Sequence, residues 1–146
     1  MGFFETMLHG EPKIHFQRIE RDGRPPVLLV ILHGGYSSGS SGKAYEELLR
    51  NRITEEFRRF CSDCGIMKDP RAVLDLKDFS YSWGDDFVEV LDFFNLTRTY
   101  AIVVGRHCRR GISTLMKMDP ETKFDCIEAP GFFLYLGEAL DYLDGL

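Results

Sequence analysis

The chain alternates short apolar runs with longer stretches of helical periodicity, and this alternation constrains the fold more than any other feature. The apolar runs lie at 27–32, 71–77 and 100–105. Continuous runs rich in leucine and β-branched residues are typical of strands that are buried on both faces. Strands that alternate with helices along a chain predict a parallel or mixed sheet with right-handed crossovers. We therefore expect an α/β domain.

The chain begins with the pattern of an antiparallel hairpin. Residues 13–20 alternate apolar and polar side chains, with one slip, as a half-buried strand does. The dipeptide Asp22-Gly23 follows, and it favours the tight turn of a hairpin. We expect this turn to join the first strand to the apolar run at 27–32. Residues 1–12 are predicted to be a loose lead-in.

Four stretches space their apolar side chains by three or four residues, which predicts amphipathic helices. The clearest covers 44–64 and is followed by Gly65, a typical helix-ending residue. Its apolar stripe, which we expect to lie on the sheet, comprises Tyr45, Leu48, Leu49, Ile53, Phe57, Phe60, Cys61 and Cys64. The other helices are predicted at about 85–95, 107–117 and 136–144.

Together these segments predict the order β-β-α-β-α-β-α-(β)-α, in which the bracketed element is a short edge strand at 131–134. We expect a small mixed sheet of four to five strands with helices packed on it. The 146 residues and 16.8 kDa suit one domain over 1–146, because no internal repeat or linker divides the sequence.

Composition and charge limit the classes of partner. The net charge is -5 and the pI is near 5.4, which argues against binding to nucleic acid or to an anionic membrane. No apolar run approaches the ~20 residues of a membrane span, and the first residues lack the basic start of a signal peptide. Four cysteines are too few for a disulfide scaffold. We expect a protein of a reducing compartment, the cytoplasm.

Three stretches resemble the STAS (sulphate transporter and anti-sigma-factor antagonist) domain family. They are VLDLKDF at 73–79, AIVVG at 101–105 and YLGEALDYL at 135–143. They resemble the strand before the family's switch loop, the strand after it and the closing helix. The resemblance spans about 13–145 and implies a non-enzymatic regulatory module without a cofactor. Its partner would be a kinase-type or stressosome-type regulator, and a homodimer stays open.

The same resemblance places the family's switch loop at Ser82, Trp83, Gly84, Asp85, Asp86 and Phe87. Phosphorylated members of the family carry a serine where this chain has Gly84, so a partner-binding role carries over and a serine phospho-switch does not. Asp85 and Asp86 instead place two fixed negative charges at a predicted helix start, where the helix dipole favours anions. We expect a permanently set switch. The single tryptophan, Trp83, is either an interface anchor or a lid on the core.

A second candidate site is basic. Four residues gather at the start of a predicted helix: Arg106, His107, Arg109 and Arg110. Cations oppose the helix dipole there, so the cluster indicates either an anionic partner or a solvated turn. Lys43 follows a Gly/Ser-rich loop that nearly reproduces a phosphate loop, but Ala44 replaces the residue whose hydroxyl would bind magnesium. We interpret the loop as a flexible helix entry at which backbone N–H groups and Lys43 could hold an anion.

Cysteine and histidine patterns predict no metal site. Cys61 and Cys64 form a CxxC, yet they lie in the apolar stripe at the end of a predicted helix, so buried thiols are expected in place of a redox or zinc centre. His33 precedes two glycines, as in the oxyanion loop of esterases. The chain has no Gly-x-Ser-x-Gly elbow, so His33 is interpreted as a strand-end residue.

An enzyme is the alternative function. The string FSYSWGDD at 79–86 resembles the Phe-Ser-x-Gly-x-Asp segment of crotonase-type acyl-CoA enzymes. A minimal crotonase-like enzyme, or another enzyme for a small acyl or anionic ligand, therefore stays open, as does binding of a lipid or small anion by the same fold. The sequence does not assemble a nucleophile or base beside an oxyanion hole, so we expect no catalysis.

Overall fold

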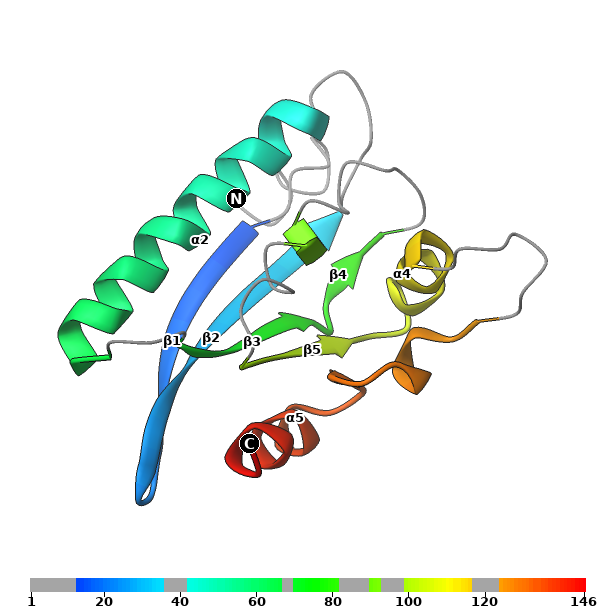
Figure 1. Ribbon diagram of the computed structural model, residues 1–146. Helices are drawn as coiled ribbons and strands as arrows, with labels where there is room; N and C mark the ends of the chain where they lie inside the picture. The colour runs from blue at the N-terminus through cyan, green and yellow to red at the C-terminus, as the bar shows by residue number, and fades with distance from the viewer. Residues whose placement is uncertain (1–12, 36–41, 67–69, 82–89, 93–98, 117–123) are drawn as a thin grey trace.

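A mixed six-stranded sheet forms the centre of the fold in the computed structural model, which confirms the predicted α/β class (Figure 1). The structure describes residues 13–35, 42–66, 70–81, 90–92, 99–116 and 124–146. The strands are β1 (Lys13–Arg21), β2 (Arg24–Gly35), β3 (Arg71–Leu76), β4 (Phe79–Ser80), β5 (Tyr100–Val104) and β6 (Phe132–Phe133).

The strand order is β1-β2-β3-β5-β6, and β4 pairs with β2 beyond the end of β3. β1 is antiparallel to β2, as the predicted hairpin requires, and the other pairs are parallel. The sequence does not predict β4, because two residues are too few to show a period. The edge strand predicted at 131–134 is β6.

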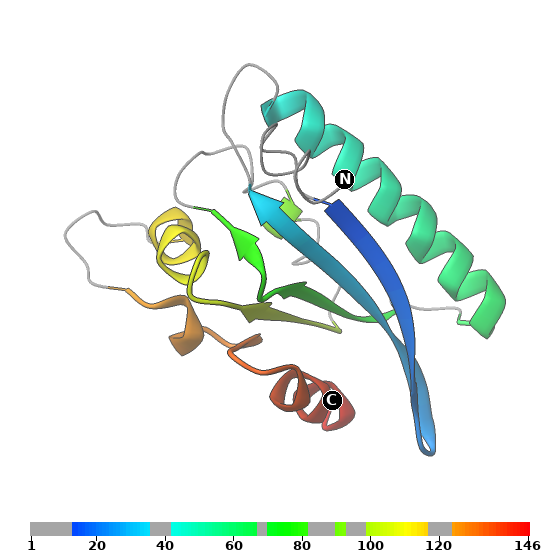
Figure 2. The same cartoon turned by 180° about the vertical axis from the view of Figure 1, so that it is seen from behind.

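Helices cover both faces of the sheet (Figures 1 and 2). They are α2 (Gly42–Cys64), α4 (Arg109–Met116) and α5 (Leu136–Asp144), with a 3-10 turn at Cys126–Glu128. α2 and α4 pack on one face, here called the α2 face, and α5 packs on the other, the α5 face. Residues 90–92 are also helical and fall within the helix predicted at about 85–95.

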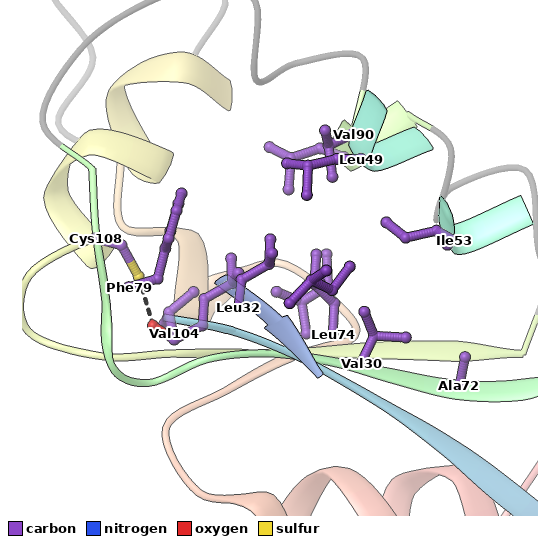
Figure 3. Packing of buried hydrophobic residues seen from close by; sticks show 14 of the residues in the cluster. Val30, Leu32, Leu49, Ile53, Ala72, Leu74, Phe79, Val90, Val104 and Cys108 are labelled. Carbon is purple, nitrogen blue, oxygen red and sulfur yellow. Dashed lines mark hydrogen bonds between the residues drawn. The ribbon is translucent and has the colours of Figure 1, made fainter. Parts of the chain in front are cut away.

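The core divides according to strand alternation. On the α2 face, Val30, Leu32 and Leu74 meet Leu49 and Ile53 of α2 (Figure 3). The α5 face buries the alternate strand residues under α5: Val27, Leu29, Val73, Ala101 and Val103, with Ala139, Leu140 and Leu143. Burial of Leu74, Leu76, Ile102 and Val104 confirms that the runs at 71–77 and 100–105 are central strands.

The apolar stripe of α2 is confirmed in its middle, is wrong at Leu48, and is less buried than expected at Cys61 and Cys64; the side chain of Tyr45 lies outside the described part. The stripe buries four side chains: Leu49, Ile53, Phe57 and Phe60. Leu48 is 56% exposed, because one residue step turns a helix by about 100° and moves Leu48 off the stripe. Cys61 and Cys64 are half-buried and not buried as predicted. Cys64 lines a hollow of about 160 Å³ between α2 and the hairpin, so one side of its thiol group is not covered by other residues.

Thiol labelling of the native protein should therefore separate the four cysteines. Cys108 and Cys126 are buried, and loss of hydration raises the pKa of both thiols, that of Cys108 to about 11. Little reactive thiolate forms there at neutral pH. We expect iodoacetamide to modify Cys61 and Cys64 well before the buried pair, as measured by peptide mass spectrometry. Earlier labelling of Cys108 or Cys126 would contradict the packing of α4.

Two local features fix the hairpin. The ladder between β1 and β2 shifts register between Ile19 and Arg21, where Glu20 alone stands against Pro25 and Pro26. Prolines lack the N–H that a regular ladder needs, and bulges are among the few places that tolerate them. Arg21 forms a two-pronged hydrogen bond with Asp144, which ties the hairpin to the end of α5.

Candidate functional site

Three parallel strands, β2, β3 and β5, end at the same edge of the sheet, and the predicted basic residues lie there (Figure 1). We call this region the carboxyl edge; it comprises Gly34–Gly35, Lys77–Asp78 and residues 105–110. The N–H of Gly34 donates to the carbonyl of Asp78 at 3.1 Å, which holds the ends of β2 and β3 together. Ligands of open α/β sheets bind at such an edge.

The turn from β5 into α4 contacts the end of β3 through its backbone. A Cβ on Gly105 would lie 2.1 Å from the carbonyl oxygen of Lys77, so only glycine fits here. The thiol of Cys108 donates to the carbonyl of Leu76 at 3.3 Å (Figure 3). These contacts fix the position of the basic turn, residues 105–110, relative to the end of β3.

The chain after β4 passes along the first turn of α4. The N–H of Tyr81 donates to the carbonyl of His107 at 3.0 Å. A Cβ on Gly111 would lie 2.4 Å from the carbonyl oxygen of Tyr81, so the two backbones are in close contact there as well. Tyr81, the last described residue before the predicted switch loop, therefore lies directly beside the basic turn. Its residues lie outside the described part of the chain: Ser82, Trp83, Gly84, Asp85, Asp86 and Phe87.

The basic residues are not equivalent. Arg106, His107 and Arg110 are exposed. Arg109 binds Asp125 with two hydrogen bonds, Nε to Oδ1 at 3.0 Å and Nη2 to Oδ2 at 2.6 Å, and this lowers the pKa of the Asp125 carboxyl. The expectation of four uncompensated cations is therefore wrong for Arg109. Within the described residues, Arg106 and Arg110 form no ion pair.

The remaining predicted residues add little to this site. Lys43 lies in the first turn of α2, and its side chain and the loop at 36–41 lie outside the described part. Among the residues that the structure describes, no three His, Cys, Asp or Glu side chains lie close enough to hold a metal ion. No helix within these same ranges is long and apolar enough to cross a membrane.

The sequence analysis missed a pair of histidines on the hairpin. The Nε2 atoms of His15 and His33 lie 2.9 Å apart, and their ring planes are within 3° of parallel. His15 is exposed and His33 is half-buried, and loss of hydration lowers the pKa of His33. Both rings lie on the α5 face, because each occupies an odd position of its strand.

Comparison of the chain with protein-family models, with curated proteins and with solved structures gives no match. The function has to be inferred from the chain's own residues.

Proposed function

We propose that the domain is a protein-binding regulatory module without catalytic activity, and that its partner surface joins the segment 82–87 to Arg106 and Arg110. The hydrogen bond between Tyr81 and His107 carries this proposal. This bond holds Tyr81, the last described residue before the segment, beside the turn that carries Arg106 and leads to Arg110. Both cations are exposed and form no ion pair with any described residue. The resemblance to STAS domains is a second support for this proposal, because in that family the corresponding segment contacts the partner.

The charges of this surface indicate the chemistry of the partner. Asp85 and Asp86 lie within five residues of Tyr81 along the chain, and Arg106 and Arg110 are held by the turn at Gly105. A partner that meets both would present acidic and basic groups side by side. Charges at the rim of an interface chiefly set the rate of association and the choice of partner. A kinase-type or stressosome-type regulator of the cytoplasm fits this description.

The aromatic residues at 79–81 favour a binding module over the crotonase-like alternative. Phe79 and Tyr81 are buried, and their rings lie 6.3 Å apart inside the α2 face. Their side chains pack in the core. Phe79 and Tyr81 therefore have a packing role, and Ser80 between them is exposed.

Charge reversal at the carboxyl edge tests the function. The full chain is used to recover its partner from the source cells after chemical crosslinking, and the affinity of the purified pair is then measured. We expect the double variant Arg106→Glu, Arg110→Glu to weaken binding by about tenfold, or about 1.4 kcal/mol. The double variant Asp85→Asn, Asp86→Asn should also change the affinity.

A matched control removes the effect of net charge. Arg52 and Arg58 are exposed on α2, away from the carboxyl edge, and the variant Arg52→Glu, Arg58→Glu makes the same change in charge. It should bind the partner as the native chain does. Equal binding by the native chain and both edge variants would exclude this surface as the partner site.

A further inference from the structure

The histidine pair of the hairpin lies outside the carboxyl edge and has no part in the proposed partner surface. His15 stands opposite Ile31 and His33 stands opposite Lys13, so the two rings are diagonal neighbours across the β1–β2 ladder. Their Nε2 atoms approach to 2.9 Å. We propose that His15 and His33 together bind a divalent transition-metal ion, and that the pair binds Cu²⁺ more tightly than Ni²⁺ or Zn²⁺.

The two nitrogens lie close enough together for both to bind one ion. Imidazole nitrogens bind these ions at about 2.0–2.1 Å, so two nitrogens at right angles about one ion lie about 2.9 Å apart. Two corners of a tetrahedron with the same bonds lie about 3.4 Å apart. Both values are close to the 2.9 Å at which the two rings form a hydrogen bond in the absence of an ion, so the pair can reach either geometry. Sites with nitrogen ligands bind Cu²⁺ more tightly than Ni²⁺ or Zn²⁺ in the Irving–Williams order, and this order gives the preference for Cu²⁺.

The pair needs only a small rearrangement to bind an ion. At 2.9 Å one ring donates its Nε2 proton to the Nε2 of the other. Binding moves that proton to Nδ1 of the donor ring through solvent, and both rings turn so that their lone pairs meet at the ion. The backbone under them is fixed, because the ladder pairs Lys13 with His33 and continues without a shift to Ile19 and Val27.

The surroundings indicate an open, exchangeable site. His15 is exposed, so water or another small ligand can take the remaining positions of the ion. The described residues supply no third His, Cys, Asp or Glu ligand, whereas structural metal sites usually have four. Lys13 brings a positive charge and Asp78 a negative charge close to His33, so the two residues have opposite effects on a bound cation.

The chain contains four histidines, which gives two test variants and two controls. Untagged full-length protein is titrated with Cu²⁺, Ni²⁺ and Zn²⁺ in a non-chelating buffer, by calorimetry and by thermal unfolding. We expect one ion per chain, tightest for Cu²⁺, and a rise in melting temperature as binding stabilises the folded state. His15→Gln and His33→Gln should each weaken Cu²⁺ binding by about 10–100-fold or more, since even the loss of an outer-shell partner costs that much.

The controls decide whether the pair itself is the ligand. His9→Gln and His107→Gln should bind Cu²⁺ as the native chain does. Circular dichroism checks that the variants keep the fold, and line broadening of the histidine ring protons by Cu²⁺ locates the ion independently. Unchanged Cu²⁺ affinity in His15→Gln and His33→Gln would overturn the assignment, and so would tighter binding of Zn²⁺ than of Cu²⁺.

Discussion

Replacing Leu76 with alanine should lower the free energy of unfolding by about 2–5 kcal/mol. Leu76 ends β3, faces Val104 across the ladder and is fully buried on the α2 face. Its own carbonyl accepts the hydrogen bond from Cys108, so the backbone is held and cannot collapse into the space that the side chain leaves. The loss of contacts and the remaining cavity both contribute to the cost.

Urea unfolding followed by circular dichroism measures this effect as a shift in midpoint at an unchanged slope. Leu48→Ala is the matched control, because Leu48 is 56% exposed and its replacement should change the free energy of unfolding by no more than about 0.5 kcal/mol. A loss below about 1 kcal/mol for Leu76→Ala would contradict its place in the core.

Gly105→Ala should cost about 1–3 kcal/mol for a different reason. The added methyl group would lie 2.1 Å from the carbonyl oxygen of Lys77 and 2.8 Å from its carbonyl carbon. Both are backbone atoms, so no side chain can swing aside and the two turns must separate. We expect the same variant to weaken partner binding, because the turn carries Arg106.

Gly137→Ala serves as the control for this substitution. A Cβ on Gly137 meets nothing within 4 Å, and the residue lies inside α5. Alanine is favoured over glycine in a helix by about 0.5–1 kcal/mol, so this variant should be more stable than the native chain. Thermal unfolding of the two variants should therefore shift in opposite directions. If Gly105→Ala unfolds at the native temperature, the close contact with Lys77 is wrong.

The fold was largely predictable because hydrophobic periodicity is a local property of the sequence. The runs at 71–77 and 100–105 could be identified as strands without knowing their neighbours. The stripe of α2 was predictable for the same reason, but the prediction was wrong at Leu48 and overestimated the burial of Cys61 and Cys64. Whether a residue at the border of a stripe is covered depends on where the helix lies over the sheet, and periodicity does not contain that information.

The sites were less predictable because they depend on contacts between distant segments. Nothing near Arg109 in the sequence indicates that Asp125 will neutralise it. The contact between His15 and His33 was not predictable for another reason. If the pairing of Arg21 with Arg24 continued without a shift, His15 would stand opposite Val30, and the two histidines would lie on opposite faces of the sheet. Only the Pro25-Pro26 dipeptide signals that the ladder shifts.

The bulge at Pro25 and Pro26 also determines where the chain can change length during evolution. Deletion of either proline would leave Glu20 opposite one residue and keep Ile19 opposite Val27, so every later pair in the hairpin would survive. Retaining both prolines without the bulge would reverse the orientation of β1 and turn Ile14 and Phe16 away from the α2 face. A homologue shorter by one residue at this point should therefore keep the same core.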